Sequence, residues 1–179
     1  SKPIELKIKR SDDAKKFPLI HTKRDGDVGF DLPAIFPYKG KYKDESVRDM
    51  YKLHSDEEIN KLDIKMRETR TVHPHERVVI PTGIHLEIPY GYWVSIEARS
   101  SASKDMLICP KGVIDEGYRG ELFAVLLNVG QKPVTIEHGD RVVQMIIHKR
   151  ENINIKIREV DELSESDRGS DGFGSTGRK

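Results

Sequence analysis

The sequence of 179 residues contains a single cysteine, Cys109. One cysteine cannot close an internal disulfide or build a cysteine-rich zinc site, which favours a reducing, intracellular compartment. No apolar run approaches the roughly 20 residues that span a bilayer, and the N-terminal residues lack the apolar stretch of a signal peptide. These shortages predict a cytoplasmic protein without membrane contact.

The sequence also lacks a surplus of charge of either sign. It has 31 Lys and Arg residues against 30 Asp and Glu residues, a formal net charge of +1. A nucleic-acid-binding protein needs a basic surplus to neutralise the phosphate backbone, so we expect no nucleic-acid partner. A local cluster of basic side chains could still hold a small nucleotide.

Short strands dominate what is present. Alternation of apolar and charged residues, the pattern of half-buried strands, occurs at residues 4–8, 84–88 and 153–157. Denser apolar runs, expected to be buried on both faces, occur at residues 78–80, 122–127 and 142–147. Glycine and proline mark turns between these runs. The pattern predicts an all-β domain over residues 1–160, built as a sandwich, jelly roll or barrel.

Residues 41–70 interrupt the strand pattern. Ser55 and Glu58 have the spacing of a capping box, and apolar residues follow at helical intervals. We expect one or two short helices inserted between strands. The insert is either a decorated surface loop or a surface that holds a protein partner.

Residues 161–179 are polar and then rich in glycine and serine, which predicts a flexible C-terminal arm. The spacing of its glycines resembles a phosphate-binding loop, but the Lys-Ser/Thr pair of a P-loop is missing. Ser175 and Thr176 could still bind an anion together with backbone amides, and Phe173 could stack on a base. An unstructured tail is the alternative interpretation of this segment alone.

Three segments near strand ends carry reactive or polar side chains. Asp115 lies at the mouth of a predicted hairpin, where it could take a proton from water or merely cap an Asx turn. Arg99 and Ser100 follow a strand and offer donors to phosphate oxygens. Gln144 lies within an apolar strand, where its amide must be hydrogen-bonded either to another part of the protein or to a polar ligand.

Together, five segments resemble the five ordered motifs of the trimeric dUTP pyrophosphatases (dUTPases). They are Val28-Gly-Phe-Asp-Leu-Pro-Ala34, Ala98-Arg-Ser-Ser-Ala102, Gly112-Val-Ile-Asp-Glu-Gly-Tyr-Arg-Gly120, Gly139-Asp-Arg-Val-Val-Gln144 and Arg168-Gly-Ser-Asp-Gly-Phe-Gly-Ser-Thr-Gly177. Each segment is modest alone, and the resemblance depends on all five occurring in order.

The resemblance implies a distorted jelly-roll homotrimer in which each active site is assembled from three subunits. It also implies hydrolysis of dUTP to dUMP and pyrophosphate with Mg²⁺. Such an activity keeps uracil out of DNA and supplies dUMP for thymidylate synthesis. The insert at 41–70 does not follow from the family, and a compact enzyme with an unusual insert would suit a phage source.

Several residue roles are also implied by the resemblance. Asp115 would activate the attacking water, Tyr118 would stack under the deoxyribose, and the backbone around Gly112 would read the uracil edge. Phosphate contacts would come from Arg99, Ser100, Ser101 and Gln144. Asp31 would support Mg²⁺ through water. From the arm of a neighbouring chain, Arg168 would approach the γ-phosphate, Phe173 would cover the uracil, and Ser175 and Thr176 would bind phosphate.

Two departures from the family pattern matter. Residues 108–111 read Ile-Cys-Pro-Lys where many relatives have an Asn available for the base, so the mode of pyrimidine selection stays open. Ser101 stands where glycine is frequent, a small change that should have little effect.

Rival interpretations remain. A dCTP deaminase, or its bifunctional relative, would need a carboxylate where Val125 stands. A regulatory protein could use the insert to recruit a partner. A cupin or lectin would need more ligands than His73 and His75, which we expect to be surface residues. We expect Cys109 to be a packed residue rather than a nucleophile.

Overall fold

The computed structural model describes residues 2–36 and 69–172. Short strands are the main regular structure of this part of the chain, with three brief 3₁₀ helices between them. In chain order the elements are β1 (Lys7–Arg10), η1 (Ala14–Lys16), β2 (Gly29–Pro33), β3 (Arg70–Val72), β4 (Arg77–Glu87), β5 (Tyr92–Ala98), η2 (Ser100–Asp105), β6 (Leu107–Ile108), β7 (Gly112–Ile114), β8 (Glu121–Asn128), β9 (Val134–Ile136), β10 (Arg141–Lys149) and η3 (Glu151–Asn154).

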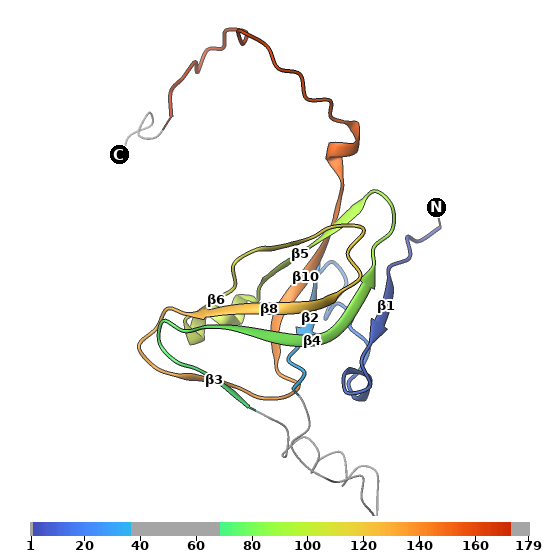
Figure 1. The fold of residues 1–179 in the computed structure, drawn as a ribbon, viewed down its shortest axis with the longest axis vertical. Coiled ribbons are helices and arrows are strands. Elements are labelled where there is room, and N and C mark those ends of the chain that lie inside the picture. Colours follow the sequence, from blue (N-terminus) through green and yellow to red (C-terminus); the bar gives the residue numbers. More distant parts are fainter. Residues whose placement is uncertain (1, 37–68, 173–179) are drawn as a thin grey trace, which may run out of the picture.

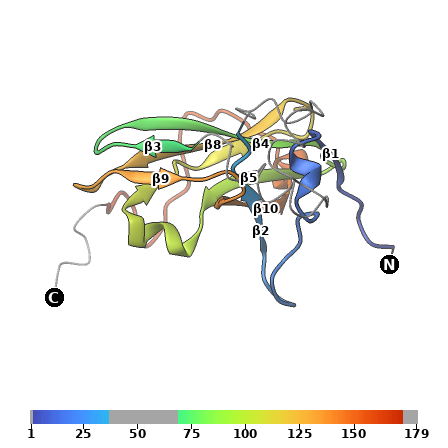
Figure 2. The same ribbon diagram turned by 90° about the horizontal axis from the view of Figure 1, so that it is seen from below.

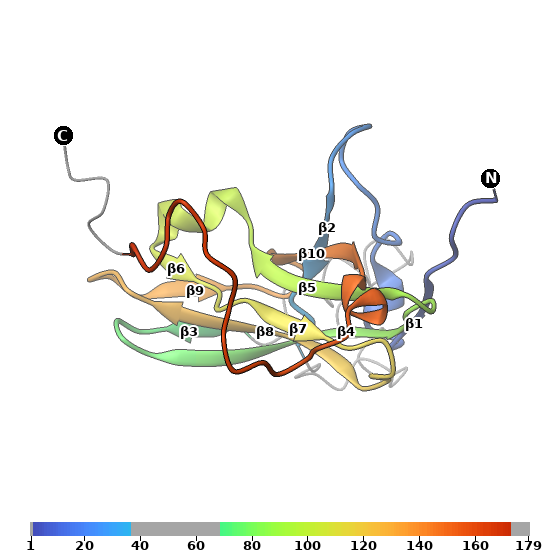
Figure 3. The ribbon, with the colours of Figure 1, turned by 90° about the horizontal axis from the view of Figure 1, so that it is seen from above.

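The strands form two antiparallel four-stranded sheets and one short ribbon. One sheet has the order β1-β4-β8-β6, the other has β2-β10-β5-β7, and β3 pairs with β9. The two sheets lie in separate layers when the molecule is seen edge-on (Figures 2 and 3). The predicted all-β, jelly-roll-like class is therefore confirmed.

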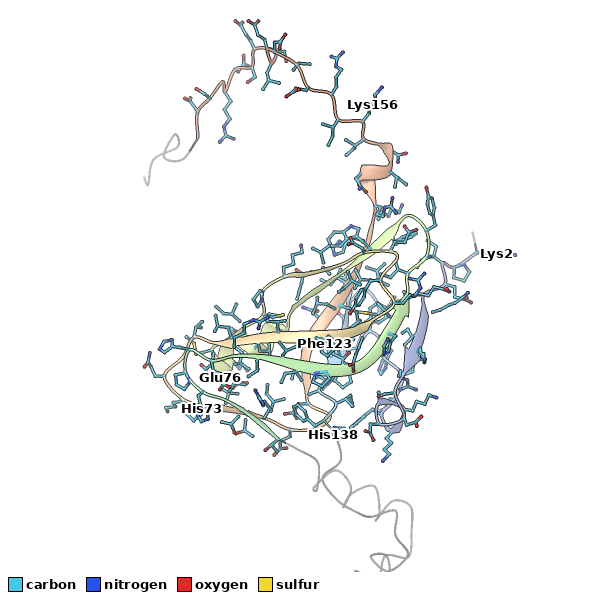
Figure 4. All side chains as sticks on the ribbon, in the orientation of Figure 1. Lys2, His73, Glu76, Phe123, His138 and Lys156 are labelled. Atoms are coloured by element: carbon cyan, nitrogen blue, oxygen red, sulfur yellow. The ribbon has the colours of Figure 1, made fainter. Side chains whose placement is uncertain are left out.

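The core lies between the two layers, and each strand contributes alternate residues to it. In β4 and β8, Ile80 and Leu122 are at most 1% exposed, whereas their neighbours Val79 and Phe123 are 47% and 42% exposed. Figure 4 labels Phe123 on β8. The expectation that the apolar runs at 78–80 and 122–127 are buried on both faces is wrong for the single chain, because the second layer covers only the inner face.

The expected strand at 153–157 is also wrong. Residues 151–154 form η3, and Ile155 and Ile157 beyond it are 64% and 93% exposed. From there the chain runs away from the sheets as an extended arm, on which Lys156 is labelled (Figures 1 and 4). Alternation shows that a segment is suited to a sheet, but it does not supply a free strand edge to pair with.

The predicted helical insert lies almost wholly outside the described residues. Its last residue, Arg70, opens β3 and pairs with Ile136 of β9. Among residues 2–36 and 69–172, no helix is long and apolar enough to cross a bilayer.

Candidate active site

Asp115 lies at the turn between β7 and β8. The turn is closed by backbone atoms, since the amide of Tyr118 donates to the carbonyl of Asp115 at 3.0 Å. The Asp115 side chain is exposed, and no hydrogen bond or ion pair occupies its carboxylate among the described residues. An Asx turn is therefore not its role, and the carboxylate is available to a ligand or a water molecule.

Tyr118 is folded back onto its own hairpin. Its hydroxyl donates to the carbonyl of Glu121 at 2.8 Å, and its ring lies where a Cβ on Gly120 would be. A side chain at position 120 would displace the ring. Tyr118 remains 42% exposed, so part of its ring surface is open to a ligand. Gly112 pairs with Ile96 in the β5–β7 ladder, and this register fixes the position of the hairpin along β5.

A pocket of about 400 Å³ opens beside this hairpin. It is lined by Trp93, Asp115, Glu116, Gly117, Arg150 and Asn152. The Trp93 indole is stacked on His148 with ring centroids 4.1 Å apart, and its Nε1 donates to the carbonyl of Lys149 at 3.2 Å. These contacts fix one wall of the pocket.

A second cluster lies just beyond the other end of β5. Arg99 Nε donates to Asp31 Oδ1 at 2.8 Å, and its Nη1 donates to the carbonyl of Arg141 at 2.9 Å. The Arg141 guanidinium lies 3.5 Å from the other oxygen of Asp31. Arg99, Arg141 and Ser101 line a pocket of about 380 Å³. The motif 139–144 was predicted to contribute to the site, but Arg141 within it was not named as a site residue. Its positive charge, next to Asp140, is the feature of the sequence that could have identified it.

Gln144 acts as a structural staple between strands. Its Nε2 donates to the carbonyl of Ala98 at 2.8 Å, and its Oε1 occupies the space that a Cβ on Gly29 would need. One N–H of the amide remains for a ligand. Ser100 begins η2, and its carbonyl accepts a hydrogen bond from Ser103 Oγ at 3.0 Å.

One chain does not bring the two clusters together. Ile114, next to Asp115, pairs with Val94 near the start of β5, whereas Arg99 follows its end. Val94 and Arg99 are five residues apart, so the rise of a strand separates them by about 17 Å. On the arm, Arg168 is exposed and its Nε donates to the carbonyl of Asp171 at 3.0 Å. The remaining predicted arm residues, Phe173, Ser175 and Thr176, lie outside the described residues.

The described residues do not form a protein-held metal site. Within 2–36 and 69–172, no three His, Cys, Asp or Glu side chains gather closely enough to ligate an ion. Asp31 is already paired with two guanidinium groups, a donor set that suits an anion better than a cation. His73 and His75 are exposed at the β3–β4 turn. Cys109 packs against the core, and this burial raises its thiol pKa.

An all-β domain with an exposed carboxylate at one hairpin and an arginine cluster at the far end of the same sheet has the fold of solved dUTPases. The Staphylococcus bacteriophage 80alpha dUTPase with dUpNHpp has a TM-score of 0.71 and 23% identity, covering 97% of this chain and 98% of that chain. The native EIAV dUTPase has a TM-score of 0.59 and 20% identity, covering 89% and 100%. These likenesses establish the fold.

Sequence comparison identifies the family. The dUTPase family model matches residues 51–177. A deoxyuridine 5'-triphosphate nucleotidohydrolase of Caldanaerobacter subterraneus is 36% identical over 177 residues, covering 97% of this chain and 98% of the relative. A protein of the same name from Orientia tsutsugamushi is 44% identical over 111 residues, covering 60% of this chain and 74% of the relative. The chain belongs to the dUTPase family.

Proposed function

We propose that the chain hydrolyses dUTP to dUMP and pyrophosphate, and thereby keeps uracil out of DNA and supplies dUMP for thymidylate synthesis. The observation that carries this proposal is the exposed, unoccupied carboxylate of Asp115 within the family's hairpin motif, residues 112–120. Membership of the dUTPase family and the activity for which the relatives are named support the same reaction.

In the proposed mechanism, Asp115 accepts a proton from a water molecule as that water attacks the α-phosphorus. A bond forms between the water oxygen and the α-phosphorus, and the bond to the α–β bridging oxygen breaks, so pyrophosphate leaves. A positioned general base contributes about 10²–10⁴-fold. Tyr118 offers an exposed ring face to the sugar, and Gly112 places the hairpin backbone for the base.

The Arg99 cluster is the proposed phosphate site. A nucleoside triphosphate carries about four negative charges, which positioned guanidinium groups stabilise. Arg99 and Arg141 supply two of these groups, with Ser100, Ser101 and the remaining Gln144 N–H as further donors. Mg²⁺ would arrive bound to the triphosphate oxygens, as part of the substrate. The role of Asp31 as a water-mediated ligand of this ion stays a prediction, because its carboxylate holds Arg99 in place.

A homotrimer with shared active sites would join the two clusters that one chain keeps apart. The outer face of the β4–β8 sheet supports such an assembly, because Val79 and Phe123 are both more than 40% exposed there. The arm, which carries Arg168, Phe173, Ser175 and Thr176, would then close over a neighbour's site. Light scattering or sedimentation measures the assembly directly.

The test of the proposed function is pyrophosphate release from dUTP, dTTP, dCTP and UTP, each with and without Mg²⁺. We expect dUTP to be the preferred substrate and Asp115→Asn to lower kcat by about 10²–10⁴-fold. Because the Asp115 side chain makes no hydrogen bond or ion pair within residues 2–36 and 69–172, its loss should leave thermal stability unchanged. The matched control is Asp12→Asn, which removes another exposed carboxylate, between β1 and η1. Wild-type kcat/KM in Asp115→Asn would contradict the mechanism.

The alternatives are less well supported. Val125 lies on β8 opposite Val79 and cannot shuttle a proton for a deaminase, and the matched relatives are nucleotidohydrolases. Ammonia release from dCTP would overturn this choice. A partner-binding role of the insert at 41–70 concerns residues outside those the structure describes. A cytoplasmic location stays a prediction from the cysteine content.

A further inference from the structure

Glu116 follows Asp115 directly but has the opposite character. Its side chain is 23% exposed and makes two contacts with segments remote in sequence. Glu116 Oε2 accepts a hydrogen bond from Arg150 Nη1 at 2.6 Å and another from the backbone amide of Gly91 at 2.9 Å. A carboxylate with two such charge-assisted bonds is firmly held.

Arg150 is itself anchored where β10 ends. Its backbone amide donates to the carbonyl of Gly91 at 2.7 Å, and its guanidinium lies 5.8 Å from the ring centre of Tyr90. The side chain is only 30% exposed. The Glu116–Arg150 pair therefore joins three segments: the hairpin turn, the β4–β5 turn and the end of β10.

The hairpin needs such an anchor because most of its other bonds are local. The Tyr118 amide, the Tyr118 hydroxyl and the Arg119 guanidinium all bond to carbonyls within three residues of themselves. Local bonds shape a turn but do not fix its position on the sheet. On the β8 side, His85 Nδ1 lies 2.8 Å from the carbonyl of Arg119 and supplies a remote contact. The Arg119 guanidinium also lies 4.0 Å from Glu87, a longer and half-exposed pair on the same side. On the Asp115 side, the remote contact is made by Glu116.

We propose that the Glu116–Arg150 pair is a positioning element that holds the Asp115 carboxylate at its working place. This inference rests on the proposed function of Asp115. Catalytic groups are sensitive to small displacements, and an error of about 1 Å can lower a rate by about 10²-fold. The two neighbouring carboxylates thus have different tasks. Glu116 makes the contacts that fix the position of the turn, and the Asp115 carboxylate remains available to activate water.

The first test compares graded variants of Arg150. Arg150→Met removes the charge and leaves Glu116 half-buried without its partner, so we expect kcat for dUTP to fall about 10-fold or more while KM changes less than about 3-fold. Arg150→Lys keeps a single ion pair and should recover most of the activity. The matched control is Arg70→Met, which breaks the Arg70–Glu76 pair of 3.9 Å. Glu76 lies beside Asn128, at the end of β8 opposite to the hairpin. Unchanged kcat in Arg150→Met would overturn the inference.

The second test asks whether the pair acts through Asp115. In an Asp115→Asn background the group to be positioned is already disabled, so Arg150→Met should cause little further loss. The same fold loss in both backgrounds would show that Arg150 acts elsewhere, and would refute the proposal even if the single variant is slow.

A readout without activity separates this inference from the proposed function. Hydrogen exchange of the peptide 112–120 should become faster in Arg150→Met, while exchange in β4 and β8 stays as in the wild type. If the wild type does not hydrolyse dUTP, the proposed function fails, but the exchange result still tests the anchor. If the wild type is active and exchange in 112–120 is unchanged, the anchor fails alone.

Discussion

Removal of the Asp31 carboxylate measures how firmly the Arg99 guanidinium is held for phosphate. The two groups are 2.8 Å apart, and their side chains are only 26% and 25% exposed. A charge-assisted hydrogen bond in such a place contributes about 1.5–3 kcal/mol. The contact to Arg141 is longer at 3.5 Å, and that side chain is 58% exposed, so it adds less than about 1 kcal/mol. Asp31→Ala should therefore lower the free energy of unfolding by about 2–3 kcal/mol.

Asp31→Asn keeps one acceptor for Arg99 and should lose about half as much. For a chain of this size, each kcal/mol corresponds to a shift of about 2–4 °C in Tm. In both variants Arg99 is no longer oriented, so we expect KM for dUTP to rise by about 10-fold for Asp31→Ala and less for Asp31→Asn.

The measurements are urea unfolding at fixed protein concentration and pyrophosphate release across a range of dUTP concentrations. Arg141→Met is the stability control for the weaker of the two contacts, with an expected loss below about 1 kcal/mol. The reasoning is refuted if Asp31→Ala is within about 0.5 kcal/mol of the wild type and its KM is unchanged.

Two further predictions concern Gly29 and Cys109. Gly29→Ala places a Cβ in the space of Gln144 Oε1, so the amide must leave the Ala98 carbonyl. We expect a loss of about 1 kcal/mol in urea unfolding, and unchanged stability would contradict this. Burial, and then the charge of Glu97, raises the pKa of the Cys109 thiol above its ordinary value of 9.0. Alkylation by iodoacetamide should be slower than that of a small thiol at pH 8 and still accelerate above pH 9, whereas a plateau below pH 9 would exclude the shift.

The sequence predicted several of the strands that find a partner within the chain, but it did not predict β2, β3 or β9, which are also paired. The alternation at 84–88 falls largely within β4, and the one at 4–8 overlaps β1, because both segments meet a neighbouring strand. The same pattern at 153–157 failed because no strand edge of the described chain lies beside it. The continuous apolar run at 122–127 likewise led to a wrong prediction of burial on both faces. The number of apolar residues in a strand does not show whether one or both faces of its sheet are covered.

The candidate site could be predicted as motifs but not as contacts. The motifs marked Asp115, Arg99 and Gln144, and the structure places each at a pocket or a strand junction. That Glu116 is bound to Arg150, 34 residues away, could not be read from either residue, because a surface carboxylate and a surface arginine are common. The sequence also left open whether Gln144 joins two strands or binds a ligand. The hydrogen bond to the Ala98 carbonyl shows that it joins two strands, and ligand binding stays a prediction.

The placement of Asp115 beside the start of β5 and of Arg99 beyond its end has a genetic consequence. If copies assemble as proposed, each working centre draws its general base from one polypeptide and its guanidinium from another. A mutation of Asp115 and a mutation of Arg99 in the same chain then disable different active sites of the assembly or different parts of one site. A chain without the carboxylate and a chain without the guanidinium, each inert alone, would complement one another in mixed assemblies.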